Sequence, residues 1–236
     1  SFQAGDLFVQ KDLSEVLIKI ANEGFKGFYE GEIAEKMVSD IQKNGGILTL
    51  DDLKNYKALS SRIVKGKFKK HDVYSLYLPS FGAITIQILQ ILDNLPTSLT
   101  EEDWAIKIGK ATDLSFQYRK HQTIEDSLKK ILSYSQAKIF ANKIQNNNIL
   151  VSNNKFDELP KSWVAQIGHT THLTAADSEG NIVSLTQTIG PTMGSKVASK
   201  GLGFLYNVTL GGYLSTSGEY KPGDRANSHI SPTLIF

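Results

Sequence analysis

The chain has 236 residues, of which 40% are hydrophobic and 21% are charged, a composition typical of a globular protein with a sizeable buried core. Its 26 lysines and arginines and its 24 acidic residues leave a net charge of +2, which gives no electrostatic argument for a nucleic-acid partner or an anionic membrane. No apolar run approaches the roughly 20 residues of a bilayer span, and without cysteine any nucleophile must be oxygen or nitrogen.

The first part of the chain is predicted to be helical and then to form two strands. Apolar residues at helical spacing indicate two helices, the second of which ends at Gly45 and Gly46. Thr49 followed by Asp52 has the form of an N-cap with an acid in the first turn, and predicts a third, short helix. The predicted elements are helices at 13–21 and 33–41, the short helix that Thr49 opens and that runs through Leu53 and Tyr56, and strands at 62–68 and 73–78, with a turn at 70–72 between the strands.

A helical layer is predicted next, followed by a loop. Apolar residues three and four positions apart predict helices at 82–94, 101–120, 124–132 and 135–147. One face of the second of these helices is expected to carry Trp104, Ile108, Ala111 and Ser115. The polar stretch 145–162 interrupts the periodicity and has the composition of an exposed loop.

The last third of the chain is strand-like. Residues 170–176 and 182–188 flank a polar, glycine-containing turn at 177–181, so a hairpin is predicted. Glycines punctuate the sequence that follows, as is typical of short strands and loops.

Most short motifs of enzyme sites are missing, including GxGxxG before a helix, GxxxxGK[ST], HExxH and GxSxG. His169 and His172 flank two threonines, but side chains three positions apart in a strand point to opposite faces. An ordinary polar role is therefore favoured over a metal site. The lysine run 65–70 fits a solvated strand face better than a contact with a polyanion.

Thr170 stands between the polar loop and the predicted hairpin. A threonine hydroxyl is a weak nucleophile until a base removes its proton, and the most compact base is the α-amine of the same residue. That amine is available only at a chain N-terminus, which cleavage of the peptide bond before Thr170 would create. From spacing alone, the alternative of a threonine that simply favours strand structure remains open.

Four stretches, in the same order along the chain, resemble the γ-glutamyltransferase family. TTHLTAADSEGNIVSLTQT, residues 170–188, resembles the start of the family's small subunit. FYEGEIAEKMVSDIQKNGGILTLDDLKNYKA, residues 28–58, is similar to a large-subunit segment, and LPSFGAITIQILQIL, residues 78–92, resembles its Pro-Ser-Ser-Gly-Gly stretch. The C-terminal ISPTLIF fits the same pattern.

This resemblance implies an N-terminal nucleophile hydrolase, an α+β protein whose two sheets stack between helical layers in a four-layer α/β/β/α sandwich. Such proteins are made as one chain that cuts itself before the nucleophilic threonine, here between His169 and Thr170. Residues 1–169 would be the large-subunit-like part and residues 170–236 the small-subunit-like part. We expect one integrated fold that is incomplete at both ends.

The resemblance also implies roles for single residues. Thr170 would attack the γ-carbonyl of a glutamyl amide such as glutathione and form an acyl-enzyme, which water or an acceptor amine resolves. Thr188 matches the second family threonine, whose hydroxyl positions the nucleophile. Ser228 matches the first of two serines that hold the substrate α-carboxylate, and His229 replaces the second.

The expected partners are small molecules, with no nucleic acid, no membrane span and no metal or organic cofactor. A soluble protein is expected, in the cytoplasm or exported, and a homo-oligomer of processed heterodimers is one open assembly state.

Several positions depart from the family pattern. Gly190 stands where an asparagine side chain is usual, and Gly211 and Gly212 stand where paired aspartates hold the substrate α-ammonium. In the short loop that would cover the site, Tyr220 is the candidate aromatic residue. An acyl donor without an α-amino group, such as a glutaryl amide, is therefore an alternative substrate. A second alternative is a catalytically degenerate relative that serves as a binding or structural protein.

Overall fold

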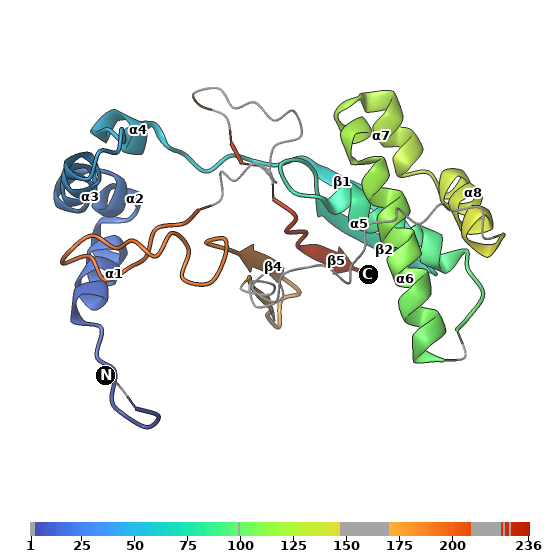
Figure 1. Ribbon diagram of the computed structural model, residues 1–236, viewed down its shortest axis with the longest axis horizontal. Coiled ribbons are helices and arrows are strands. Elements are labelled where there is room, and N and C mark those ends of the chain that lie inside the picture. Colours follow the sequence, from blue (N-terminus) through green and yellow to red (C-terminus); the bar gives the residue numbers. More distant parts are fainter. Residues whose placement is uncertain (1–2, 99, 147–169, 209–222, 224, 227) are drawn as a thin grey trace. The chain divides into compact units, whose positions relative to one another are not determined.

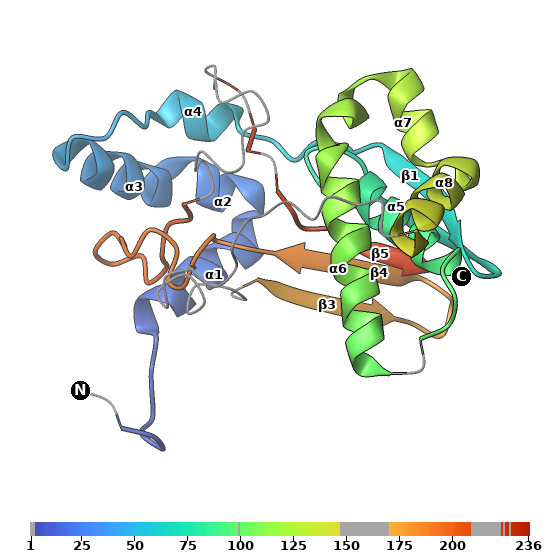
Figure 2. The same ribbon diagram turned by 45° about the vertical axis from the view of Figure 1, so that its right-hand side comes forward.

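The structure is a computed structural model that describes residues 3–98, 100–146, 170–208, 223, 225–226 and 228–236 (Figures 1 and 2). The chain divides into two compact units, of which the first comprises Ser1–Ser60 and Ile189–Val208. The second unit comprises Ser61–Thr188 and Thr209–Phe236. Each unit therefore combines sequence from both sides of Thr170.

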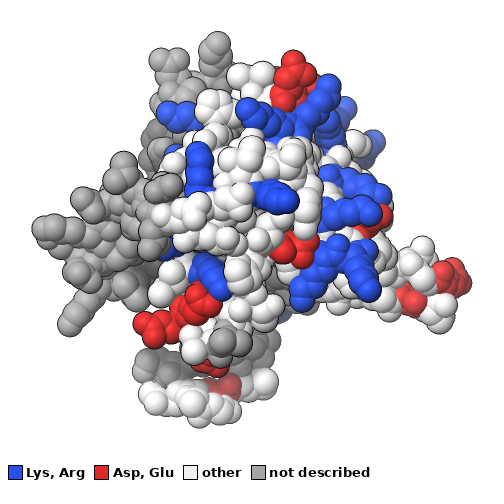
Figure 3. All heavy atoms as spheres, turned by 90° about the vertical axis from the view of Figure 1, so that its right-hand side faces the viewer, with Lys and Arg blue, Asp and Glu red and all other residues white. Residues whose placement is uncertain are grey.

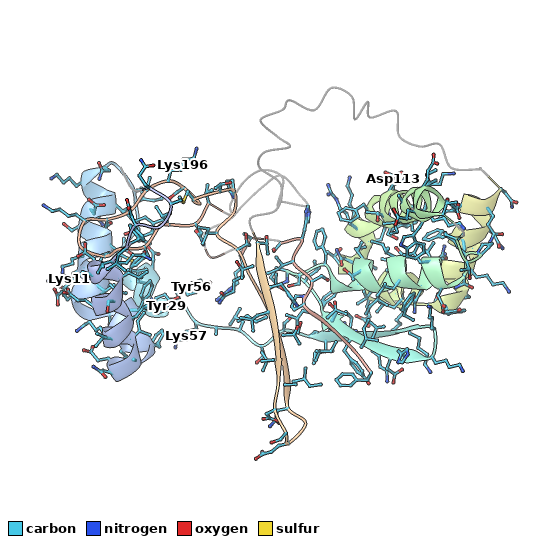
Figure 4. The ribbon with its side chains drawn as sticks, turned by 90° about the horizontal axis from the view of Figure 1, so that it is seen from below. Lys11, Tyr29, Tyr56, Lys57, Asp113 and Lys196 are labelled. Carbon is cyan, nitrogen blue, oxygen red and sulfur yellow. The ribbon has the colours of Figure 1, made fainter. Side chains whose placement is uncertain are left out.

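The first unit is built on the helices α1 (Lys11–Glu23), α2 (Phe25–Tyr29), α3 (Gly31–Lys43) and α4 (Leu50–Asn55). A capping box starts α4 as predicted, because the Thr49 hydroxyl accepts the Asp52 backbone N–H while the Asp52 carboxylate accepts the Thr49 backbone N–H. The Tyr29 and Tyr56 rings stack with centroids 5.7 Å apart. Both residues are labelled in Figure 4. Leu202, 1% exposed, completes the core formed by Val16, Ile33 and Met37.

The second unit contains a three-stranded antiparallel sheet in the order β1 (Ile63–Phe68), β2 (His71–Leu76) and β5 (Thr233–Ile235). The predicted turn at 70–72 is wrong, since Phe68 pairs with His71 and only Lys69 and Lys70 connect the two strands. Lys69 has a φ of +54°, which such a tight turn requires. His71 and Asp72 are polar but continue the strand, because both pair with β1 and Asp72 is also hydrogen-bonded to the backbone of Phe236.

Helix α5 (Gly82–Asp93) packs on this sheet. The helices α6 (Glu101–Gln117), α7 (Glu125–Ile131) and α8 (Tyr134–Gln145) pack against α5, and the 3-10 helix η1 (Arg119–Thr123) lies against α6 and α7. Gly66 lets α5 approach β1, because a Cβ atom at this position would lie 2.2 Å from the Ile86 side chain. The predicted face of α6 is only half right. Ala111 and Ser115 are buried, whereas Trp104 and Ile108 are 43% and 37% exposed.

The predicted hairpin is present as β3 (Thr171–Ala176) paired with β4 (Ile182–Gln187). The Asp177 carboxylate closes its turn by accepting the backbone N–H groups of Glu179 and Asn181 and the Asn181 side-chain amide. The pKa of Asp177 is lowered mainly by the bond from the Asn181 side chain. The expected loop at 145–162 lies, except for its first two residues, outside the described residues. Within the described residues, no helix is long and apolar enough to cross a membrane.

Candidate functional site

The two candidate threonines lie at the open end of the β3–β4 hairpin. The ladder of this hairpin ends at the pair Thr171 and Gln187. One further step in the same antiparallel register brings Thr170 opposite Thr188. Residues directly opposite one another in such a pair have Cβ atoms about 4.5–5.5 Å apart. The hairpin therefore supports an approach of the two hydroxyl-bearing side chains at its end.

One face of the hairpin carries a row of hydrogen-bonding side chains. Because successive strand residues alternate between faces, His172 points to the same side as Thr170. The Nδ1 atom of His172 lies 2.7 Å from the Thr186 hydroxyl, and its Nε2 atom lies 3.3 Å from the Thr174 hydroxyl. Both ring nitrogens are thus engaged, which supports the predicted polar role over a metal site. Among the described residues, no group of three or more His, Cys, Asp or Glu side chains could hold a metal ion. His169 lies outside them.

Ser228 and His229 lie against the connection between β2 and α5. The Ser228 backbone N–H donates to the Pro79 carbonyl at 2.8 Å, and the Phe81 backbone N–H donates to the Ile230 carbonyl at 3.3 Å. The Ser228 hydroxyl accepts the Ile230 N–H at 3.2 Å. Two stretches that resemble the same family, more than 140 positions apart, thus lie side by side.

Strand directions bring these parts to the same end of the second unit. The Ser184 hydroxyl of β4 donates to the Thr233 carbonyl of β5 at 3.5 Å. In Figures 1 and 2 the arrows of β4 and β5 lie next to one another and point in opposite directions. Since β2 is also antiparallel to β5, the ends of β2 and β4 and the start of β5 lie at one end. Thr170, Thr188 and Ser228 belong to this end, which is the candidate active site.

A cluster of hydroxyl groups fixes the chain between Ser228 and β5. The Thr85 hydroxyl donates to the Ser231 hydroxyl at 2.8 Å, and the Thr233 hydroxyl donates to the Ser75 hydroxyl at 3.1 Å. Ser75, which is 4% exposed, donates in turn to the Pro232 carbonyl at 2.9 Å. Sequence reasoning missed this cluster, whose one signal was the family-like Ser-Pro-Thr stretch. A partly buried, hydrogen-bonded cluster of this kind rigidifies the backbone that presents Ser228 and His229.

His229 packs against two aromatic rings. Its ring centroid lies 4.8 Å from that of Phe81 and 5.7 Å from that of Phe116. Burial against its neighbours lowers the pKa of His229, and the positive charge of Arg119 lowers it further. The imidazole is therefore neutral at pH 7. Sequence reasoning missed Phe81 and Phe116, because no local pattern shows that they contact His229.

Gly190 adopts a backbone conformation that side chains rarely take. Its φ is +95°, and a Cβ atom would lie 2.7 Å from the Val208 carbonyl oxygen. The local backbone therefore favours glycine at this position over the asparagine that is usual in the family pattern. The other departures, Gly211, Gly212 and Tyr220, lie outside the described residues.

The lysine run 65–70 is partly neutralised within its own hairpin. The Asp72 carboxylate lies 2.8 Å from the Lys65 ammonium and 3.9 Å from that of Lys67. This pairing raises the pKa of Lys65 and lowers that of Asp72. Figure 3 shows lysine and arginine side chains on the surface of the molecule with acidic side chains among them. The ion pairs of Asp72 with Lys65 and Lys67 support the interpretation of the run 65–70 as a solvated strand face.

Comparisons with known sequences converge on one family. The sequence model described as gamma-glutamyltranspeptidase matches residues 1–236. The glutathione hydrolase proenzyme of Pseudomonas sp. (strain A14) is 29% identical over 257 residues, which cover 99% of this chain and 44% of that protein. Glutathione hydrolase proenzyme 2 of Schizosaccharomyces pombe is 32% identical over 217 residues, which cover 87% of this chain and 35% of that protein. The capsule biosynthesis protein CapD proenzyme of Bacillus anthracis is 28% identical over 236 residues, covering 99% and 42%.

Two solved structures are similar to the chain. Cephalosporin acylase from Bacillus halodurans superposes with a TM-score of 0.75 at 20% identity, over 99% of this chain and 43% of that protein. The gamma-glutamyltranspeptidase of Helicobacter pylori gives a TM-score of 0.53 at 30% identity, over 61% of this chain and 44% of that protein. The chain thus spans less than half the length of these relatives.

Proposed function

The chain belongs to the gamma-glutamyltranspeptidase family, and from this membership we propose that it forms part of a self-processing enzyme with Thr170 as its nucleophile. The fold is α+β and of the N-terminal nucleophile hydrolase type, as predicted. The proposed reaction is transfer or hydrolysis of a γ-glutamyl or related acyl amide, such as glutathione. The observation that supports this proposal is the register of the hairpin, which ends at the pair Thr171 and Gln187 and which, continued by one step, would bring Thr170 opposite Thr188.

In the proposed reaction, cleavage between His169 and Thr170 frees the α-amine of Thr170. This amine accepts the proton of the Thr170 hydroxyl as the oxygen attacks the carbonyl carbon of the donor. The amine leaving group takes up a proton and departs, which leaves an ester on Thr170. Water or an acceptor amine then attacks the ester and restores the hydroxyl. The Thr188 hydroxyl orients the nucleophile, and Ser228 and His229 bind the donor.

Within this chain, cleavage would separate residues 1–169 from residues 170–236, and contacts within each unit support the continued association of the two products. Leu202 of the second product is buried among residues of α1 and α3 of the first. Strand β5 of the second product pairs with β2 of the first. Hydrophobic burial and backbone hydrogen bonds of this kind do not depend on the peptide bond before Thr170.

The substrate is narrowed by the departures from the family pattern. The backbone at Gly190 disfavours a side chain, and Gly211 and Gly212 supply no carboxylate for an α-ammonium group. A buried ammonium group without a negative partner is costly, so an acyl donor that lacks the α-amino group fits these residues. The same missing side chains favour the second candidate function, a degenerate relative that binds without catalysis.

Intact-mass measurement of the full-length protein tests the proposal. Wild type should yield two fragments separated between His169 and Thr170, and Thr170→Ala should remain one chain. Thr171→Ala is the matched control, because Thr171 is the next residue but lies on the opposite face of the hairpin; it should still be cleaved. A single chain for wild type would instead favour the degenerate relative.

Turnover of two chromogenic donors then identifies the substrate. Glutaryl-p-nitroanilide and γ-glutamyl-p-nitroanilide differ only in the α-amino group. Thr170-dependent release of p-nitroaniline from the glutaryl compound alone would support a donor without that group. Release from the γ-glutamyl compound alone would instead support a γ-glutamyl donor.

A further inference from the structure

The first unit carries an open groove of about 570 Å³ along α3 and the start of α4. Its lining residues are Glu35, Val38, Ser39, Gln42, Lys43 and Leu50. The Gln42 side-chain amide donates to the Leu48 carbonyl at 2.8 Å, which ties the connection between the two helices to α3. Apolar surface belongs to this region, because Leu50 is 46% exposed and Ile47, in the connection, is 92% exposed. The groove thus has a fixed wall and exposed apolar groups beside it.

Three of the lining residues form one row along α3. Glu35, Ser39 and Lys43 are four positions apart from one another, a spacing that forms a ridge on a helix surface. All three are exposed. The row starts with an acidic side chain and ends with a basic one about 12 Å further along the helix axis. The small Ser39 lies at its midpoint.

The two charges of this row are too far apart along the helix to pair with each other. A neighbouring pair on α3 is compensated, since the Lys36 ammonium lies 2.8 Å from the Glu32 carboxylate. Within the part of the chain that the structure describes, no ion pair is formed by Glu35 or by Lys43. One acceptor and one donor of an ion pair therefore remain available at the two ends of the groove.

We propose that this groove is the contact surface for a second copy of the chain, with the two α3 helices crossing antiparallel about a twofold axis at Ser39. In a twofold contact, a residue that meets a second residue of the other copy is met in return by the same pair reversed. The antiparallel crossing sets Glu35 of each copy opposite Lys43 of the other and forms two equal ion pairs. A small residue at the crossing point allows the helix axes to approach to about 8 Å, and rows of this spacing interdigitate in the commonest class of helix packing.

The charge pattern favours a second copy over an unrelated partner. The row has no net charge, so it attracts neither an acidic nor a basic surface as a whole, and its own reversed copy is its complement. A contact limited to one helix and its connection lies at the small end of protein interfaces, so we expect a dissociation constant in about the micromolar range. The inference is independent of the proposed function, because Glu35 and Lys43 belong to the first unit and Thr170, Thr188 and Ser228 do not.

Sedimentation equilibrium of the full-length protein tests the proposed dimer. Glu35→Lys and Lys43→Glu each replace both ion pairs by pairs of like charge, so each should raise the dimer dissociation constant about tenfold or more. Lys26→Glu is the matched control, because it makes the same change in net charge as Lys43→Glu at an exposed position of α2 outside the groove. It should change the dissociation constant less than about twofold.

Mixing the two reversed variants separates this contact from any other mode of association. The charged ends of the row are both basic in Glu35→Lys and both acidic in Lys43→Glu, so an equimolar mixture should dimerise about as well as wild type. The double variant Glu35→Lys/Lys43→Glu should do the same, and circular dichroism checks that each variant is folded. The proposal is overturned if wild type is monomeric at about 100 µM, if the reversed variants dimerise as well as Lys26→Glu, or if the mixture does not regain the dimer.

Discussion

Replacement of Leu202 by alanine is expected to destabilise the first unit. Leu202 is 1% exposed and packs with Val16, Ile33 and Met37, so the substitution removes buried methyl groups and leaves a cavity between α1 and α3. Substitutions of this type cost about 2–5 kcal/mol, and an almost fully buried leucine supports a value of about 3 kcal/mol. This loss would also weaken the attachment of residues 189–208 to the helices.

Urea denaturation of wild type and Leu202→Ala, monitored by far-ultraviolet circular dichroism, measures this loss of stability. Leu59→Ala is the control within the same unit, because Leu59 is 68% exposed and its replacement should change the free energy of unfolding by less than about 0.5 kcal/mol. A loss below about 1 kcal/mol for Leu202→Ala would refute the anchoring role given to this residue. So would an equal loss for the two variants.

Three further predictions concern the site. Thr188→Ala should lower kcat about 10- to 100-fold, and Thr188→Ser should retain most activity, because in the proposed site the hydroxyl of residue 188 orients the nucleophile. Equal activity of the two variants in a p-nitroanilide assay would contradict this role. Gly190→Asn should lower the free energy of unfolding by about 1–3 kcal/mol, because of the positive φ and the nearby Val208 carbonyl, and a neutral result in urea would contradict that strain. Burial and the charge of Arg119 lower the pKa of His229 in the folded protein. Between that lowered pKa and the unfolded value of about 6.5, the unfolded chain therefore binds more protons than the folded one. The stability that this residue contributes is present above about pH 6.5 and is lost as the pH falls below it. Unfolding from pH 8 to pH 5 should therefore depend less on pH in His229→Ser than in wild type, and identical profiles would argue against the shift.

Local sequence signals predicted several elements well. The Thr49 capping box and the β3–β4 hairpin depend on residues close in sequence, and the structure confirms both. The turn at the start of β2 was misplaced because polar His71 resembles a turn residue, while its pairing with Phe68 of β1 keeps it extended. Tertiary pairing overrode local preference there.

The candidate site was only partly predictable, because its members come from distant segments. Resemblance pointed to Thr170, Thr188, Ser228 and His229, but no periodicity links His229 to Phe116, which lies more than 100 positions earlier. That contact exists because residues after β4 return to pair β5 with β2 and bring the preceding segment against the start of α5. Periodicity identifies a buried face, but it does not say which distant residue covers it.

The arrangement of backbone contacts also bears on the proposed cleavage before Thr170. The pairs of the hairpin ladder begin at Thr171. The segment that presents Ser228 is bonded to the Pro79 carbonyl, and its continuation is bonded into β2. A cut before Thr170 therefore breaks none of these contacts. The hairpin ladder lies wholly downstream of that bond, and the pairing of β5 with β2 joins the two sides of the cut without involving it. In the proposed reaction, cleavage would therefore free the amine of Thr170 and leave these contacts in place.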